Sequence, residues 1–191
     1  SPNLDLKELC EVLKANSTLT KLNLSNCHVY ALYLNHFADL LETNKTITSF
    51  HLVSCNIDFY GLFDKREQRY LSNRIVVNQT ITTLDLRKNC LNDSDMFWIR
   101  DILKLNNSIT KLNLGSNWIY DDGMKMLSKA LKKNRILTNL NLESNYISGI
   151  GIYYLALSLE VNKTLTKLNL GFNQVDNIGA TFLSVPLSND S

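Results

Sequence analysis

The 191-residue sequence predicts an α/β solenoid, an arc with a parallel β-sheet on its concave side and helices on its convex side. Three observations support this prediction. The pattern L-x-x-L-x-L-x-x-N/C-x-L, with other apolar residues in some Leu slots, occurs six times. Successive copies are 28 residues apart at every step except one. Each copy is followed by apolar residues three and four positions apart, the spacing of a helix with one buried face.

The six copies of the pattern begin at Leu19, Ile47, Ile81, Ile109, Leu137 and Leu165. Their alternating apolar residues predict strands near 20–25, 48–53, 82–87, 110–115, 138–143 and 166–171. The apolar positions between Met124 and Leu131 predict one of the helices that follow. A single repeat cannot bury its own core, whereas stacked repeats can. We therefore expect one domain over residues 1–191, built from about six repeats.

The two ends of the sequence contain only the helical half of a repeat, near residues 4–16 and 178–187. Neither half resembles a fully polar cap, although terminal repeats are expected to shield the core. We expect the chain to be a piece of a longer protein or array. The alternative is a small natural protein whose half-repeats serve as caps.

Asparagine recurs at two positions of the repeat. The N/C slot holds Cys27, Cys55, Asn89, Asn117, Asn145 and Asn173. We expect Asn in this slot to bond main-chain groups of its own and adjacent repeats, with Cys as a small buried substitute. The second series precedes each strand, where we expect a helix end in the left-handed conformation, and comprises Asn16, Asn44, Asn78, Asn106, Asn134 and Asn162. Five of these form N-x-T/S sequons, which we interpret as helix-exit turns rather than as glycosylation sites.

Composition excludes several functions. The chain has 20 basic and 18 acidic side chains, so a nucleic-acid partner, a membrane surface or a strongly charged ligand is not expected. The N-terminal residues do not resemble a signal peptide, which favours a cytoplasmic protein. The four cysteines form no CxxC pair or metal-ligand spacing, and no catalytic or nucleotide-binding motif is present. We expect no enzyme activity, metal, cofactor or small-molecule substrate, and a monomer.

The 28-residue period, the N/C alternation and the helical outer segments resemble the ribonuclease-inhibitor-type leucine-rich repeats over about residues 5–187. That class includes ribonuclease inhibitor, the repeat domains of NOD-like receptors, Ran GTPase-activating proteins and effectors of intracellular bacteria. The resemblance implies a leucine-rich repeat horseshoe and a protein partner. We predict a non-enzymatic interaction module, a cytosolic effector or scaffold, acting in the host cytosol if the source is bacterial. The alternatives are the sensor domain of a larger NOD-like receptor and a GTPase-activating protein.

Strand alternation places every second residue of the predicted strands on the concave surface. We expect the adjacent Asp85 and Arg87 to form a solvated pair, and the Cys55 thiol to point into the core, away from His51. The residues predicted to bind a partner from this surface are Lys21, Asn23, His51, Asp85, Arg87, Lys111, Asn113, Asn141, Glu143 and Lys167.

Aromatic residues gather after the strands. Trp118, Tyr120 and Tyr146 lie in strand-exit loops, and Phe172 lies beside the inner row of the last repeat. These residue types are frequent binding anchors. We predict that Trp118, Tyr146 and Phe172 form a ridge that contacts the partner. The alternative is that each covers the flank of the neighbouring repeat.

The second repeat contains six extra residues within about 58–70. Insertions in solenoids map to loops on one face, often the binding face. This insertion combines aromatic and charged residues, so Arg66 and Arg69 are also predicted to contact a partner. The alternative is drift that adds a helical turn.

Overall fold

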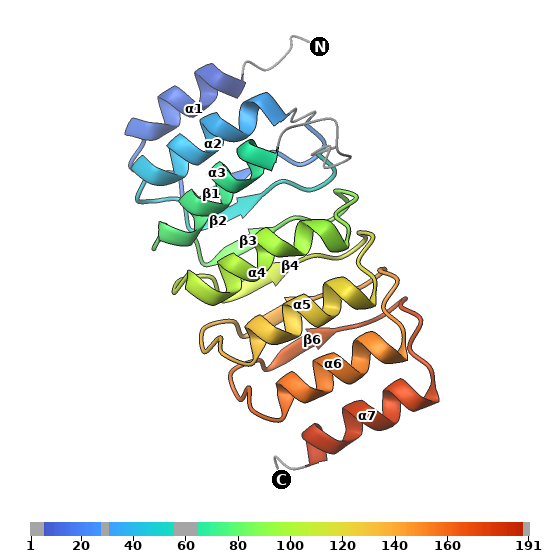
Figure 1. Cartoon of the computed structure of the whole chain (residues 1–191). Helices are drawn as coiled ribbons and strands as arrows, with labels where there is room; N and C mark the ends of the chain where they lie inside the picture. Colours follow the sequence, from blue (N-terminus) through green and yellow to red (C-terminus); the bar gives the residue numbers. More distant parts are fainter. Residues whose placement is uncertain (1–5, 28–30, 56–64, 189–191) are drawn as a thin grey trace.

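The computed structural model describes residues 6–27, 31–55 and 65–188 (Figure 1). The described helices are α1 (Leu6–Ala15), α2 (Ala31–Thr43), α3 (Lys65–Val77), α4 (Met96–Leu105), α5 (Asp121–Leu131), α6 (Gly149–Leu159) and α7 (Asn177–Ser188). The described strands are β1 (Lys21–Asn23), β2 (Ser49–His51), β3 (Thr83–Asp85), β4 (Lys111–Asn113), β5 (Asn139–Asn141) and β6 (Lys167–Asn169). A short 3₁₀ helix, η1 (Asp93–Asp95), precedes α4.

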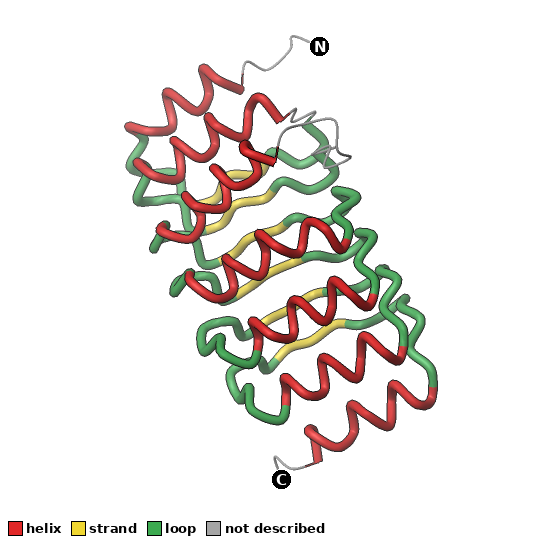
Figure 2. The backbone as a smooth tube through the Cα atoms, viewed as in Figure 1, coloured by secondary structure: helices red, strands yellow, loops and turns green. Residues whose placement is uncertain are grey.

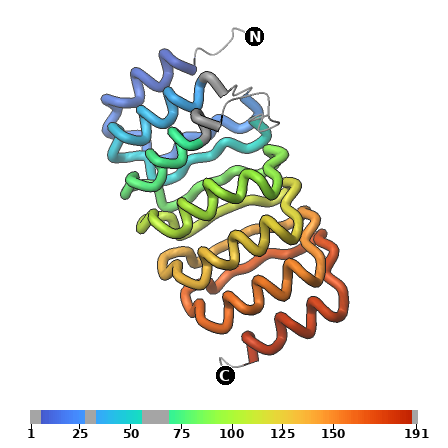
Figure 3. Tube along the Cα trace, viewed as in Figure 1, coloured from blue at the N-terminus to red at the C-terminus, as the bar shows by residue number. Residues whose placement is uncertain are grey.

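The strands form one parallel sheet in the order β1-β2-β3-β4-β5-β6. Leu84 pairs with Leu112, and Leu112 with Leu140, so neighbouring strands are in register with the repeat. The helices lie side by side along one face of the sheet, and the two ends of the chain lie at opposite ends of the array (Figures 1 and 2). The chain advances one repeat at a time from one end to the other (Figure 3). The predicted α/β solenoid is confirmed.

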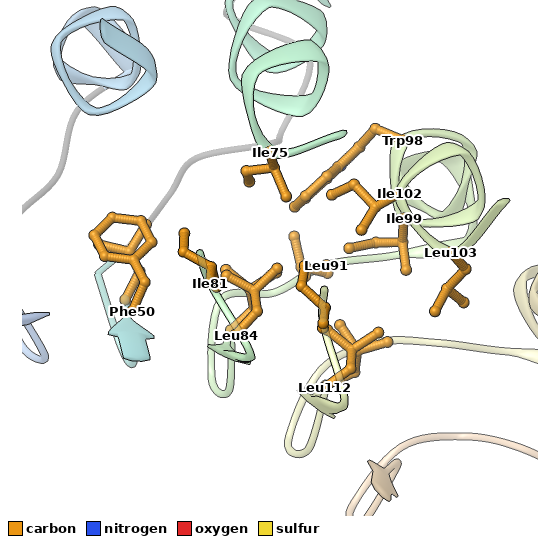
Figure 4. Close-up of a cluster of buried hydrophobic side chains, with 14 of the residues drawn as sticks. Phe50, Ile75, Ile81, Leu84, Leu91, Trp98, Ile99, Ile102, Leu103 and Leu112 are labelled. Atoms are coloured by element: carbon orange, nitrogen blue, oxygen red, sulfur yellow. The ribbon is translucent and has the colours of Figure 1, made fainter. Parts of the chain in front are cut away.

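The core lies between the sheet and the helices. Leu84 and Leu112 point from β3 and β4 toward the helix layer, where Ile99 and Ile102 of α4 lie, and Phe50 points from β2 toward the same layer (Figure 4). All five side chains are buried. Burial of such a side chain contributes about 1.5–3 kcal/mol, and stacking supplies it to every internal repeat.

The asparagines of the N/C slot form the predicted ladder through the core. Asn117 Oδ1 accepts hydrogen bonds from the N–H groups of Asn89 (2.9 Å) and Leu91 (3.0 Å). Its Nδ2 donates to the carbonyl oxygens of Leu86 (3.1 Å) and Leu114 (2.9 Å). Each such asparagine therefore satisfies main-chain groups of two repeats that stacking would otherwise leave unpaired.

The two cysteines in this slot differ in burial. Cys55 is fully buried, and its thiol donates to the carbonyl oxygen of Leu24 at 3.1 Å. Cys27 is only half-buried, so the expectation of a buried thiol is correct for Cys55 and wrong for Cys27. Cys27 lies in the first strand-containing repeat. The main-chain N–H of Cys55 donates a hydrogen bond to Asn89 Oδ1 of the next repeat.

The asparagines before the strands also bond the preceding repeat, but the predicted left-handed backbone is wrong for them. Asn106 is extended (φ −77°, ψ 138°), because its Oδ1 accepts from the N–H groups of Ser108 and Ile109 at the strand entrance. Its Nδ2 donates to the Ile75 and Asn78 carbonyls. The sequon asparagines Asn44, Asn78, Asn106 and Asn162 are buried with their amides bonded in this way, which favours the turn interpretation over glycosylation.

The left-handed conformation occurs instead just after each strand. There the chain must turn sharply toward the helix layer, and the equivalent residue of every repeat has φ between 52° and 62°, with Cys90 (φ 56°) as a second one in the third repeat. The equivalent residues are Asn26, Ser54, Lys88, Ser116, Ser144 and Phe172.

Candidate functional site

The concave face is formed by side chains that alternate with the buried leucines of the strands. In β1 the outer residues Lys21 and Asn23 are exposed while Leu22 is buried. The same alternation places the later predicted residues on this surface. We define the concave face by Lys21, Asn23, Ser49, His51, Thr83, Asp85, Arg87, Lys111, Asn113, Asn139, Asn141, Glu143, Lys167 and Asn169.

A polar cluster occupies the N-terminal part of the concave face. Arg87 binds Asp85 with two parallel hydrogen bonds, Nη2 to Oδ2 at 2.9 Å and Nε to Oδ1 at 3.1 Å. Asp85 Oδ2 also lies 3.3 Å from His51 Nδ1, and His51 Nε2 lies 2.7 Å from Ser49 Oγ. The expected Asp85–Arg87 pair forms, but Asp85 is only 4% exposed, so the expectation that the pair is solvated is wrong for the carboxylate and holds for the exposed Arg87 side chain. The adjacent strands enclose the carboxylate, and His51 and Arg87 replace its water.

The order Ser49–His51–Asp85 resembles that of a hydrolase triad, but the surroundings do not favour catalysis. The carboxylate is shared with Arg87. The main-chain N–H of Ser49 donates to Thr20 and that of Thr83 donates to Thr48, so both are used by the sheet. These N–H groups therefore cannot stabilise a developing oxyanion. The cluster instead fixes the orientation of polar groups on the surface.

Cys55 lies close to His51 in sequence, but its thiol does not join this cluster. It donates into the core, toward the Leu24 carbonyl. Burial raises the pKa of the Cys55 thiol to about 12, so the thiol remains protonated at neutral pH. A Cys–His nucleophile pair is not formed.

A row of amides occupies the C-terminal half of the concave face. The Oδ1 atoms of Asn113, Asn141 and Asn169 each accept the main-chain N–H two residues later, at 3.1, 2.9 and 3.0 Å. Together with Lys111 and Lys167, these amides line a shallow hollow of about 370 Å³ over β3 to β6. Glu143 borders the row and accepts a 3.0 Å hydrogen bond from Asn169 Nδ2.

We define the exit edge by Trp118, Tyr120, Tyr146 and Phe172. The rings of Tyr120 and Tyr146 stack across two repeats, with centroids 4.9 Å apart and an interplanar angle of 10°. Both are substantially exposed, at 49% and 41%, whereas Trp118 is half-buried. Phe172 is 83% exposed and has a φ of 54°. Tyr146 thus pairs with Tyr120, and a ridge of Trp118, Tyr146 and Phe172 stays a prediction.

Of the two arginines predicted from the insertion, only the Arg69 side chain is described, and it does not join the concave face or the exit edge. Arg69 is exposed on α3 and lines a hollow between the outer helices with Phe97 and Arg100 of α4. Arg66 lies in α3, but its side chain is outside the described part of the chain, as are residues 56–64.

Sequence reasoning did not identify Ser49 or Asn169 as site residues. Ser49 is small and ordinary by itself, and its role depends on the register that pairs His51 with Asp85. The i to i+2 spacing of Ser49 and His51 on one strand was the available signal. The repeat could have identified Asn169 as a site residue, because Asn169 occupies the same position of the repeat as Asn113 and Asn141.

None of the helices within residues 6–27, 31–55 and 65–188 has the length and apolar character needed to cross a membrane. No group of three or more His, Cys, Asp or Glu side chains within those ranges could hold a metal ion.

Comparisons with known proteins agree with the geometry. Four segments, residues 15–29, 77–97, 105–128 and 161–184, match the family described as Leucine Rich repeat. A structure titled Leiomodin-1 Actin-Binding Site 2 is 21% identical, with a TM-score of 0.60, over 100% of this chain and 93% of that one. A tropomodulin C-terminal domain from Caenorhabditis elegans is 12% identical, with a TM-score of 0.57, over 97% and 93% of the two chains. No curated protein sequence matches significantly. The ribonuclease-inhibitor-type subclass stays a prediction.

Proposed function

We propose that this chain, a leucine-rich repeat solenoid, is a non-enzymatic protein–protein interaction module. We treat residues 1–191 as one domain that binds a protein partner through the concave face and the exit edge. The observation that carries the proposal is Phe172, a large apolar side chain that is 83% exposed on a left-handed backbone.

Phe172 is unfavourable for folding in two respects. A left-handed backbone costs an ordinary residue roughly 1–2 kcal/mol, and an exposed ring contributes little burial energy. The equivalent positions hold Asn26, Ser54, Lys88, Ser116 and Ser144, none of which is apolar, and Asn in particular tolerates this conformation. Strain and apolar exposure at one residue of the last described repeat favour a contact with a further protein surface over a role in the stability of these repeats.

The stacked pair Tyr120–Tyr146 supports the same surface. Stacking at 4.9 Å restricts both rings before a partner arrives, so less conformational entropy is lost on binding. Tyrosine is also among the residues that most often dominate interface energies. The exit edge therefore offers two preordered anchors beside the concave face.

For the cellular role we favour a cytosolic effector or scaffold over the sensor domain of a receptor. Four free cysteines are usual for a reducing compartment, and the frequent Asn, Lys, Ile and Tyr favour an AT-rich bacterial or protist genome. A bacterial effector would act in the cytosol of its host. A GTPase-activating role is disfavoured because Arg87, the arginine of the concave face, is held by both Asp85 oxygens and is not poised to reach a phosphate.

The test is affinity capture from eukaryotic cytosol, followed by mass spectrometry and binding measurements with the recovered partner. Purified actin is the first named protein to assay, because the similar leiomodin-1 structure is titled an actin-binding site. We expect the variant Tyr146→Ser/Phe172→Asn to bind at least tenfold more weakly, about 1.4 kcal/mol, without unfolding. The matched control is Phe97→Ser, which removes an exposed aromatic (51%) from the outer helix α4. Equal binding by both variants and the wild type would contradict the proposal.

A further inference from the structure

We infer that the hollow over β3 to β6 binds the acidic face of a helix in the partner protein. This inference rests on the proposed function and names the chemistry of the partner. It depends on three properties of the hollow: the amide atoms that remain available, the sign of its unpaired charge, and the distance between its two lysines.

The amides of Asn113 and Asn141 present donors to the hollow. Their Oδ1 atoms accept the N–H groups of Gly115 and Glu143, and a main-chain N–H can only donate. That bond fixes the amide orientation and leaves each Nδ2 without a main-chain partner. Within the described residues, neither Nδ2 has a hydrogen-bond partner, and neither is among the buried unsatisfied atoms. An occupant that supplies oxygen acceptors would satisfy both.

The unpaired charge of the hollow is positive, although the whole chain has a net charge of only +2. Lys111 and Lys167 are exposed, and no carboxylate of the described residues pairs with either. Asp85 is neutralised by Arg87. Glu143, at the border of the hollow, accepts only from the neutral Asn169 amide and keeps its charge, so the two lysines leave an excess of one positive charge. A negatively charged occupant is therefore favoured at this place, contrary to the expectation drawn from net charge.

The spacing of the lysines selects a helix over a strand. Lys111 and Lys167 occupy equivalent positions two strands apart, with Asn139 between them. At about 4.8 Å per strand their separation along the sheet is about 10 Å. Residues seven apart on a helix lie on one face about 10.5 Å apart, at 1.5 Å per residue. Same-face residues of an extended strand are about 7 or 13 Å apart, which fits less well.

The lining also distinguishes an acidic helix from a nucleic acid. Single-stranded nucleic acid is bound by runs of cations together with aromatic platforms for the bases. The hollow has two ammonium groups, and the residues that line it include no aromatic ring. A helix with carboxylates seven residues apart would place them near Lys111 and Lys167. A third acceptor between the carboxylates would lie near the Asn141 amide.

The experiment compares two labelled alanine-based helical peptides of about 20 residues and identical composition. One has glutamates on a single face at i, i+3 and i+7, and the other has them distributed around the helix. Fluorescence anisotropy at low salt gives the affinities, and ¹⁵N spectra report the Asn113 and Asn141 side-chain amides. We expect the one-face peptide to bind about fivefold more tightly, the gain of one well-placed exposed ion pair. It should also shift both amide signals.

Charge reversal supplies the matched control. Lys111→Glu/Lys167→Glu should abolish the preference between the two peptides, whereas Lys104→Glu/Lys129→Glu, on α4 and α5, should retain it at the same net charge. Circular dichroism melting confirms that each variant is folded. The inference is overturned by equal affinity for the two peptides, by equal losses in the two variants, or by equally tight binding of an oligodeoxythymidylate of the same charge. None of these results affects the proposed function, which is tested separately by the sensitivity of partner binding to the exit edge.

Discussion

At the residue scale, Phe172 is expected to lower the stability of the fold and to strengthen partner binding. Replacing it with Asn keeps the left-handed turn and removes the strain of a bulky side chain at φ 54°. We expect Phe172→Asn to increase the free energy of unfolding by about 0.5–1 kcal/mol while it weakens partner binding. Urea denaturation and a binding assay on the same preparation test both effects. A less stable variant would show that the ring contributes to folding.

Asn117 is expected to be among the most sensitive polar residues of the core. Asn117→Ala removes two accepted and two donated hydrogen bonds and leaves the N–H groups of Asn89 and Leu91 buried without a partner. We expect a loss of about 2–4 kcal/mol in the free energy of unfolding. The control is Asn113→Ala on the concave face, with an expected loss below about 1 kcal/mol. Similar losses from both variants would contradict the ladder.

The buried thiols predict an alkaline limit to stability. Burial raises the pKa of Cys10 and Cys55 to about 12 from an ordinary value of 9.0. Between these values the unfolded chain ionises its thiols while the folded chain keeps them protonated, so stability is complete below pH 9 and falls above it. Urea titrations at pH 8, 9 and 10 should give a steeper loss for the wild type than for Cys10→Ala/Cys55→Ala. Parallel curves would rule out the contribution of the thiols.

At the residue scale the sequence predicted which side chains share a surface but not how they bond. Strand alternation was enough to place Lys111 and Asn141 on the concave face. The burial of Asp85 could not be predicted from the sequence. It depends on the contact of its carboxylate with His51 on the adjacent strand and with the guanidinium of Arg87. The net charge of the chain also did not predict the positive hollow, because it does not show which charged side chains pair with one another.

At the element scale, consecutive helices are tied together by carboxylates at their N-terminal ends. Asp121, the first residue of α5, accepts hydrogen bonds from the N–H groups of Ser148 (2.9 Å) and Gly151 (3.0 Å) and from the Ser148 hydroxyl (2.6 Å). It therefore stabilises the start of α6 one repeat later. Gly151 permits this approach, because a Cβ there would lie 2.6 Å from Asp121 Oδ1.

We expect Asp121→Ala to lower the free energy of unfolding by about 1–3 kcal/mol and to increase amide exchange at the start of α6. Asp122→Ala is the matched control. It removes an exposed carboxylate from the same helical turn and should change stability by less than about 1 kcal/mol. Urea denaturation and hydrogen exchange measure the two effects. Equal stability of the two variants would mean that Asp121 does not couple the repeats.

Helices and strands were predictable because the repeat presents each signal six times. The backbone turn was misplaced, because Asn is common both at helix ends and in turns, and only the geometry separates the two uses. The side chain of Asn106 accepts main-chain hydrogen bonds at the entrance of a strand, whereas Asn26 adopts the left-handed conformation after a strand.

At the scale of the whole molecule, we expect the concave side of the arc to bind the partner and the outer helices to support the sheet. Lys21, Lys111 and Lys167 lie on the concave face, while Lys104 and Lys129 lie on the outer helices. The lysines are therefore natural reporters of which side a partner covers.

The most direct test is lysine acetylation footprinting of the chain, alone and in complex with its captured partner, read by mass spectrometry. We expect Lys111 and Lys167 to lose reactivity severalfold in the complex while Lys104 and Lys129 keep theirs. Protection of Lys104 and Lys129 with unchanged Lys111 and Lys167 would place the partner on the helices and contradict the account.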